Sequence, residues 1–215
     1  MATRQRRDRS DSVDKELTDL FRIALERNNA IGKEIAVIAV GGYGRAELSP
    51  GSDLDIVILH NDAIDNLPDI VNAFLYPLWD SGRAIDHSVR NRSEMKSAIA
   101  SDHKVAMGLL NARFIAGNQT FAHRVVSDIS TQAKKKMSTF LPELRAITHE
   151  RHQRQGELAY LLEPDLKEAR GGLRDVTLIR AISDCLEITV PFDRVANAES
   201  SLLNIRDALH EVSGR

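Results

Sequence analysis

The chain has 215 residues, enough for one full-sized domain and part of a second. Hydrophobic residues make up 42% and charged residues 28%, as in ordinary globular proteins, which argues against wholesale disorder, a collagen-like repeat or a coiled-coil rod. The 29 Lys and Arg nearly balance the 31 Asp and Glu, so the net charge of −2 gives no chain-wide field that would attract nucleic acid or an anionic membrane.

The ends and the cysteine content point to a protein of the cytoplasm. No apolar run approaches the ~20 residues that a membrane helix needs. The first residues, MATRQRRDRS, lack the apolar core of a secretory signal. The single cysteine, Cys185, cannot form an internal disulfide, which suits a reducing compartment. We therefore expect a cytoplasmic location and no membrane or nucleic-acid partner.

The first part of the chain predicts a helix followed by two strands. Residues 1–10 carry four arginines and almost no apolar side chain, so we expect a disordered basic tail. Apolar residues spaced by three and four predict a helix over 11–29. The run EIAVIAV at 34–40 predicts a strand buried on both faces. After a break at Ser49, Pro50 and Gly51, a second strand is predicted over 53–60.

The remainder changes from mixed to purely helical patterns. A helix over 67–79, a weaker strand over 83–90 and two short helices beginning near Ser93 and Asp102 complete the first part. Strand signals then fade, and helical patterns cover 121–137, 142–155, 173–186 and 201–212. The sequence thus predicts a mixed α and β domain over 11–120 and an all-α domain over 121–215, which we expect to be incomplete because the chain ends directly after a helical pattern.

A glycine turn after the first strand forms half of a possible phosphate site. Gly41 and Gly42 lack a Cβ, which lets backbone N–H groups approach an anion closely. A short helix beginning near Gly44 would turn its N-terminus toward the same anion, and Arg45 would add a fork of donors. A glycine pair alone is a weak signal, because it more often marks an ordinary turn.

Two carboxylates at the start of the second strand form the other half. Residues i and i+2 of a strand share a face, so Asp53 and Asp55 point together while Leu54 enters the core. Such a pair repels itself unless a positive group lies between the carboxylates. Mg²⁺ takes oxygen ligands, commonly one or two carboxylates plus substrate phosphates. The combination with the glycine turn therefore predicts a magnesium and phosphate site.

These residues resemble a known family. The segment GGYGRAELSPGSDLDIVIL resembles the nucleotidyltransferase signature of the DNA polymerase β superfamily, and within it the amino-terminal region of the bacterial PII-protein uridylyltransferases. Two further blocks, HSVR at 87–90 and LEPDLKEARGGLRD at 162–175, are similar to segments of that family. The resemblance covers 33–215. It implies an α+β nucleotidyltransferase domain, with a small mixed sheet flanked by helices, followed by an all-α domain that is truncated here.

The resemblance also implies a reaction and roles for individual residues. The reaction is transfer of a nucleoside monophosphate from UTP to a tyrosine of the PII signal protein, with Mg²⁺ present and pyrophosphate released. Carried onto this chain, Gly41 and Gly42 would hold the triphosphate, and Ser52 would add a hydroxyl donor. Asp53 and Asp55 would bind the metal.

The superfamily usually supplies a third carboxylate from a neighbouring strand, and Asp86 is the candidate, with a salt-bridged surface residue as the alternative. In the second block, Lys167 and Arg174 would reach the triphosphate from the helical side. An interdomain salt-bridge network with Glu163 and Asp175 is an equal alternative for them.

Other functions stay open at this point. Relatives continue into a phosphohydrolase domain that removes the nucleotide and into small-molecule sensing domains, and neither pattern is visible here. We therefore expect a fragment, a truncated gene product or a reduced relative without the removing activity or glutamine sensing. Nothing between Gly41 and Asp55 distinguishes one base from another, so adenylyl transfer from ATP or another acceptor is an alternative. A truncated, non-catalytic module that binds nucleotide or PII is a further one.

Overall fold

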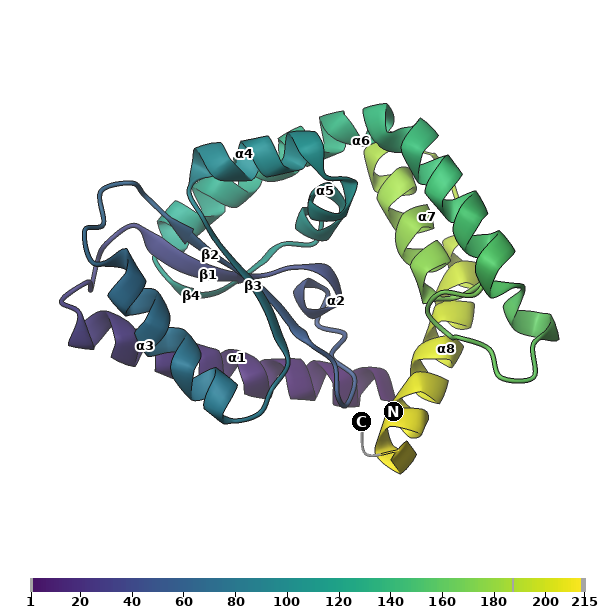
Figure 1. Cartoon of the computed structure of the whole chain (residues 1–215), viewed down its shortest axis with the longest axis horizontal. Helices are drawn as coiled ribbons and strands as arrows, with labels where there is room; N and C mark the ends of the chain where they lie inside the picture. The colour runs from purple at the N-terminus through teal and green to yellow at the C-terminus, as the bar shows by residue number, and fades with distance from the viewer. Residues whose placement is uncertain (1, 187, 214–215) are drawn as a thin grey trace.

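The computed structural model describes residues 2–186 and 188–213. Within them, four strands form a mixed sheet in the order β3-β2-β1-β4 (Figure 1). β1 runs antiparallel to both β2 and β4, whereas β2 and β3 are parallel. The strands are β1 (Ile35–Ala39), β2 (Leu54–His60), β3 (Ile85–Arg90) and β4 (Arg113–Gly117).

Helices cover both faces of the sheet and continue beyond it (Figure 1). This confirms the predicted fold class, a small mixed sheet flanked by helices and followed by a helical region. Across the described ranges, none of the helices has the length and apolar character needed to cross a membrane. The helices are α1 (Ala2–Arg27), α2 (Gly41–Gly44), α3 (Leu67–Asp80), α4 (Arg92–Ser101), α5 (His103–Leu109), α6 (Gln119–Gln155), the short 3₁₀ helix η1 (Leu158–Tyr160), α7 (Leu173–Leu186) and α8 (Phe192–Ser213).

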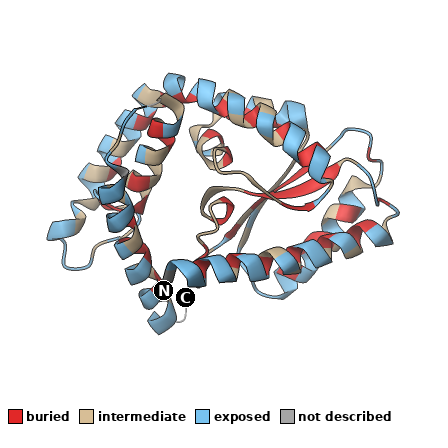
Figure 2. Cartoon of the chain, turned by 180° about the vertical axis from the view of Figure 1, so that it is seen from behind, coloured by how far each residue is buried: buried red, intermediate tan, exposed pale blue. Residues whose placement is uncertain are grey.

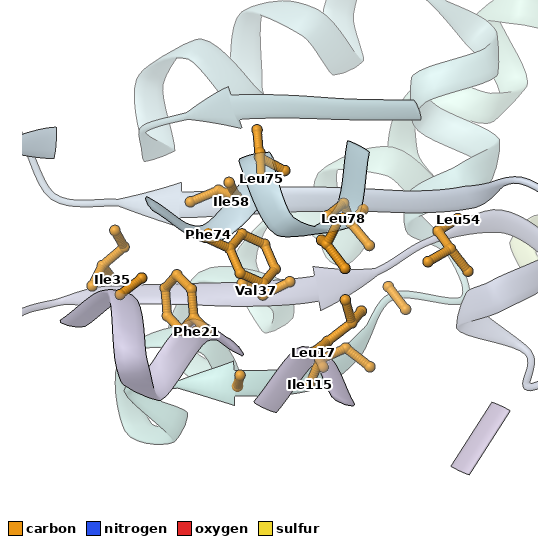
Figure 3. Packing of buried hydrophobic residues seen from close by; sticks show 14 of the residues in the cluster. Leu17, Phe21, Ile35, Val37, Leu54, Ile58, Phe74, Leu75, Leu78 and Ile115 are labelled. Carbon is orange, nitrogen blue, oxygen red and sulfur yellow. The ribbon is translucent and has the colours of Figure 1, made fainter. Parts of the chain in front are cut away.

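One face of the sheet packs against α1 and α3. Leu17 and Phe21, four residues apart, project from the buried side of α1 onto the sheet (Figure 3). Phe21 meets Phe74 of α3 edge to face, with ring centroids 5.1 Å apart. Both rings are fully buried. The odd residues of β1 and the even residues of β2 complete this core, because side chains alternate along a strand.

The other face packs against α4, α5 and the first half of α6. Ala36 and Ile38 of β1 and Val57 and Leu59 of β2 lie in this second core. By the same alternation Asp55, two residues before Val57, lies on this side of the sheet at the end where β2 begins. The register of the sheet therefore sets which side the predicted metal ligands face.

The predicted disordered tail is wrong for residues 2–10; residue 1 lies outside the described residues. These residues form the first turns of α1. The Arg6 side chain is only 2% exposed and forms an ion pair of 2.6 Å with Asp207 of α8. Ser10 is buried and donates to the Arg6 carbonyl. The segment has almost no apolar residues, which predicted disorder. It is held instead by the charged side chain of Arg6, whose partner Asp207 lies 201 positions away in the sequence.

Two helices predicted over 121–137 and 142–155 form a single helix, α6. Pro142 lies inside it. A proline in a helix interior removes one hydrogen bond and crowds the preceding turn, which bends a helix more often than it ends one when both sides are packed. Figure 1 shows that α6 changes direction near its middle, so that its first half follows the sheet and its second half lies beside α7. Phe140 and Leu144, on either side of the proline, are both buried.

The division of the chain at residue 120 stays a prediction. It falls beside the first residue of α6, and the first half of α6 shares the core of the sheet. A separate small cluster forms only later, where Leu173, Leu202 and Leu203 pack together. The packing thus places the change of core closer to the bend of α6 than to its start.

Two further elements differ from the predictions. β4 was not predicted; it is five residues long and lies at the edge of the sheet beside β1. α8 begins at Phe192, earlier than the predicted 201. It returns to α1, and the last turns of α8 lie beside the first turns of α1 (Figure 2). The elements therefore close into a ring with the start of β2 on its inner side (Figure 1).

Candidate active site

A cavity of about 580 Å³ lies between the sheet and the helical region. The glycine turn and the start of β2 form one wall, and residues 164–177 and α8 form the other. The cavity brings together nearly all of the site residues predicted from the sequence. Those on its wall are Gly41, Gly42, Arg45, Ser52, Asp53, Asp55, Lys167 and Arg174. Asp86 is not among the lining residues.

The glycine turn is a single helical turn, α2, which begins at Gly41, three residues before the predicted start near Gly44. Gly41 has a φ of +57°, a conformation that favours glycine. A Cβ at this position would lie 3.0 Å from Oδ2 of Asp55. The glycine thus lets the backbone approach the carboxylate directly. The first N–H groups of a helix have no partner within it, so this turn offers donors at the cavity wall.

Side chains of α1 and β4, which were not predicted as part of the site, contact the glycine turn on the side away from the cavity. The Tyr43 hydroxyl donates to Asp14 of α1 at 2.5 Å. Arg113 of β4 donates to the same carboxylate and to the carbonyls of Tyr43 and Gly44. Burial and the neighbouring Asp14 raise the pKa of Tyr43, so the hydroxyl remains a donor at neutral pH. A Cβ on Gly44 would lie 2.2 Å from the Asn111 carbonyl, so only glycine fits there.

The three predicted carboxylates gather at one corner of the sheet. Asp55 of β2 is directly paired with Asp86 of the parallel strand β3, so both side chains lie on the same face. Asp53 precedes β2 and lines the cavity together with Asp55. Burial, and then the charges of Asp86 and Asp53, raise the pKa of Asp55. Among the described residues, none of the three has an oxygen within 4.0 Å of a basic group, so this corner carries uncompensated negative charge.

The loop before Asp53 is a tight turn. The Ser52 hydroxyl, predicted to contact the nucleotide, accepts a hydrogen bond of 3.1 Å from the backbone N–H of Ser49. Its backbone N–H donates in return to the Ser49 carbonyl at 3.2 Å. Arg9 of α1 holds the preceding Leu48 carbonyl at 2.7 Å. The hydroxyl proton of Ser52 stays available for a ligand.

On the opposite wall, the two predicted cations differ. Arg174 forms a bidentate ion pair with Glu168. Its Nε donates to Oε2 at 2.8 Å, and its Nη2 donates to Oε1 at 2.5 Å. Lys167 forms no ion pair within 4.0 Å among the described residues, and its charge acts to lower the pKa of Asp55 across the cavity. Arg45 is paired with Glu47 at 2.7 Å. Lys167 is therefore the predicted cation with the least compensated charge.

The alternative salt-bridge network of the second block does not form as predicted. Asp175 pairs instead with Arg151 and His152 of α6 and accepts from the backbone N–H of Gly171 at 2.7 Å. Burial acts to raise the pKa of Asp175, but these hydrogen bonds lower it below its usual value. The network joins α6 to α7 behind the cavity wall. Arg151 of this network also donates to the Glu168 carbonyl, next to Lys167, at 2.6 Å.

Helix α8 supplies residues that the sequence analysis did not identify. Arg206 and His210 line the cavity. They lie one turn apart on α8, and both contact the turn at Ser49 and Pro50. No sequence pattern marks them, because more than 150 positions separate them from that turn. Only the closure of the ring brings them to the site.

Comparison with known proteins identifies the family. The family model described as "Nucleotidyltransferase domain" matches residues 20–153, more than half of the chain. The chain belongs to this nucleotidyltransferase family. A second family model, "GlnD PII-uridylyltransferase", matches residues 139–197, which include the second block of the sequence analysis. Together the two matches confirm the resemblance stated from the motifs.

Individual relatives agree with the family. A protein of Streptomyces coelicolor named "Bifunctional uridylyltransferase/uridylyl-removing enzyme" is 44% identical over 98% of this chain. Proteins of the same name from Mycobacterium tuberculosis and Erythrobacter litoralis are 39% and 32% identical over 84% and 92% of it. The aligned part is 25%, 23% and 23% of these relatives. The chain thus spans about a quarter of the length of the curated relatives it matches.

The nucleotidyltransferase site fits a divalent metal. Asp53 and Asp55 offer hard oxygen ligands, and the pKa of Asp55 is raised first by burial and then by the negative charges of Asp86 and Asp53, which a cation would offset. Among the described residues, no group of three His, Cys, Asp or Glu forms a metal cluster. A divalent metal of this kind takes oxygen ligands from carboxylates, phosphates and water. Asp86, paired with Asp55 across the parallel strands, stays a prediction as the third carboxylate.

Proposed function

We propose that this nucleotidyltransferase domain transfers UMP from UTP to a tyrosine hydroxyl of the PII signal protein. The observation that carries the proposal is the arrangement of charge in one cavity. The carboxylates of Asp53 and Asp55 lie beside the glycine turn, and the ammonium of Lys167, which has no ion-pair partner among the residues that the structure describes, lies on the facing wall. A triphosphate with a divalent metal has the complementary charges. The printed names of the relatives supply UTP and PII as the substrates to test first.

In this proposal each wall of the cavity has its own task. Backbone N–H groups of Gly41 and Gly42 and the hydroxyl of Ser52 hold phosphate oxygens. Asp53 and Asp55 hold Mg²⁺, which supplies neutralisation of the charge that develops on the phosphates. The tyrosine oxygen forms a bond to the α-phosphorus, the bond from that phosphorus to the β-phosphate oxygen breaks, and pyrophosphate leaves. Positioning and charge neutralisation carry the rate of such a transfer.

The helical wall would bind the leaving pyrophosphate. Lys167 contributes a free ammonium, whereas Arg174 and Arg45 already share their charges with glutamates and so contribute less. Asp86, beside Asp55 but exposed, is the candidate for receiving the tyrosine proton. We place this reaction in the cytoplasm, as the sequence predicts.

The test is transfer of labelled UMP from UTP to purified PII. We expect transfer that requires Mg²⁺ and falls at least on the order of 10²-fold in Asp53→Asn and in Asp55→Asn, because a catalytic metal supplies several kcal/mol. The exposed Asp65→Asn is the matched control and should retain full activity. Undiminished labelling by the Asp53→Asn/Asp55→Asn double variant would refute the assigned role of the carboxylates.

The same assay separates the alternatives. Parallel reactions with UTP and ATP identify the nucleotide, since the glycine turn contacts phosphate and not the base. Calorimetry with each nucleotide tests for a non-catalytic module. Binding without release of pyrophosphate, at every concentration of PII, would favour that module over an enzyme.

A further inference from the structure

The position of Asp53 depends on the turn that precedes it. Ser49 is buried, and it exchanges hydrogen bonds with Ser52 across the turn. Gly51 has a φ of +69°, which closes the turn in a conformation that favours glycine. Asp53 follows directly and is exposed to the cavity. The geometry of this turn therefore determines where the first carboxylate meets a metal.

Helix α8 holds this turn at two points. Arg206 donates to the Ser49 hydroxyl from Nε at 3.1 Å and from Nη2 at 2.5 Å. One helical turn later, Nδ1 of His210 donates to the carbonyl of Pro50. The two guanidinium nitrogens thus donate to a single hydroxyl oxygen, and the backbone of the same serine is hydrogen-bonded to Ser52. These contacts connect the end of the chain to the metal-binding end of β2.

Arg206 carries a charge that these contacts leave uncompensated. Among the described residues it forms no ion pair within 4.0 Å; its side chain is half-buried, and the charges of Asp207 and Glu47 act on it in part against those of Arg6 and Arg45. Burial lowers its pKa, which reflects the energetic cost of holding the guanidinium there. Partial burial of a cation that has no direct carboxylate partner costs free energy. Arg206 lines the same cavity as Asp53 and Asp55, so its charge adds to that of Lys167 on the side facing those carboxylates.

The anchoring of α8 does not depend on Arg206. The next residue, Asp207, points to α1 and pairs with Arg6, and Asn204 accepts from the same guanidinium at 3.1 Å. Glu199 of α8 pairs with Arg180 of α7. The helix is therefore attached to α1 and α7 by other side chains. This leaves Arg206 free for a local task.

We propose that Arg206 is a positioning residue of the nucleotidyltransferase site, acting through Ser49 to set the turn that presents Ser52 and Asp53. The inference rests on the proposed function for its consequence in catalysis. The part that does not depend on catalysis is that Arg206, on α8, controls the affinity of Asp53 and Asp55 for a divalent cation. That content can be measured without nucleotide or acceptor.

The test titrates the full chain with Mn²⁺ and follows free Mn²⁺ by electron paramagnetic resonance. We expect Arg206→Gln and Ser49→Ala each to weaken Mn²⁺ binding by at least about 5-fold, equivalent to about 1 kcal/mol. The double variant should be no weaker than the weaker single one, because both changes break one interaction. Arg206→Lys, which keeps the charge and loses the fork, should recover only part of the affinity. Arg194→Gln, exposed on the same helix, is the control.

Each outcome decides the inference. Mn²⁺ affinity equal to the parent in Arg206→Gln, additive losses in the double variant, or no Mn²⁺ binding by the parent chain would overturn it. Thermal melting of every variant separates a local change from unfolding, and Ser49→Ala keeps the test valid if Arg206→Gln melts early. Transfer from UTP is assayed in parallel. Absence of transfer with the expected Mn²⁺ pattern would remove the proposed function and leave the positioning role standing.

Discussion

Replacing Arg6 by methionine should destabilise the protein strongly. Arg6 is 2% exposed, and its partner Asp207 is 12% exposed. Arg6 also donates to Asn204 at 3.1 Å and to Thr3 at 3.2 Å. The variant would leave Asp207 buried without its cation, and one oxygen of that carboxylate already has no hydrogen-bond partner. Breaking a buried pair in this way costs about 3–5 kcal/mol. At about 2–4 °C per kcal/mol for a chain of this size, the melting temperature should fall by about 6–20 °C.

Urea denaturation followed by circular dichroism measures this cost, with Arg4→Met as the matched control. Arg4 lies on the same helix, but its side chain is 87% exposed and its distance to Asp8 is 3.8 Å, so its loss should cost no more than about 0.5 kcal/mol. Adding Asp207→Leu to Arg6→Met should recover much of the lost stability, because the unpaired charge is then removed. Equal costs for Arg6→Met and Arg4→Met would refute the reasoning and would return residues 2–10 to the disordered tail expected from composition.

Three further predictions concern the site and its supports. Burial and two neighbouring carboxylates raise the pKa of Asp55, so the folded state loses stability as pH rises through that pKa. In metal-free buffer, Asp55→Asn should therefore have a larger free energy of unfolding than the parent at pH 7. Urea denaturation should show a smaller gain at pH 3. Gly44→Ala, whose Cβ would lie 2.2 Å from the Asn111 carbonyl, should lower the free energy of unfolding by about 1–3 kcal/mol, measured the same way. Burial opposes the shift, but hydrogen bonding lowers the pKa of Asp175 below 3.8, so the ionised carboxylate stabilises the fold above that pH. Asp175→Asn should therefore lower the free energy of unfolding at pH 7. A difference from the parent that is just as large at pH 2 would contradict this assignment.

The part of the site formed by neighbours in sequence could be predicted. A buried strand, a glycine turn and a second strand lie within about 27 residues, and hydrophobic pattern and turn chemistry determine them locally. The alternation of side chains along a strand placed Asp55 correctly, and it placed Asp86 on the same face of the adjacent strand. These predictions needed no information about distant contacts.

The part formed by distant residues could not be predicted. The burial of Arg6 depends on Asp207, and the contact of Arg206 with Ser49 spans 157 positions. Single arginines carry no periodic signal, so an arginine in a buried pair looks the same in sequence as one in solvent. Pro142 led to a wrong prediction of two helices for a related reason. The packing on both sides of a proline, which the sequence does not show, decides whether the helix continues through it. β4, with the sequence RFIAG, was missed because it has neither the alternation of a half-buried strand nor the long apolar run that marked β1.

The closure of α8 onto α1 has a consequence for the order of events during synthesis. Arg6 leaves the ribosome about 200 residues before Asp207, and chains are made at about 5–20 residues per second. For at least about ten seconds the guanidinium must remain hydrated and the first turns of α1 unsupported. The sheet and the glycine turn can fold in that time, because their contacts lie early in the chain. The helical wall is synthesised after the sheet, so a nascent chain has Asp53 and Asp55 in place before Lys167 and Arg206 can face them.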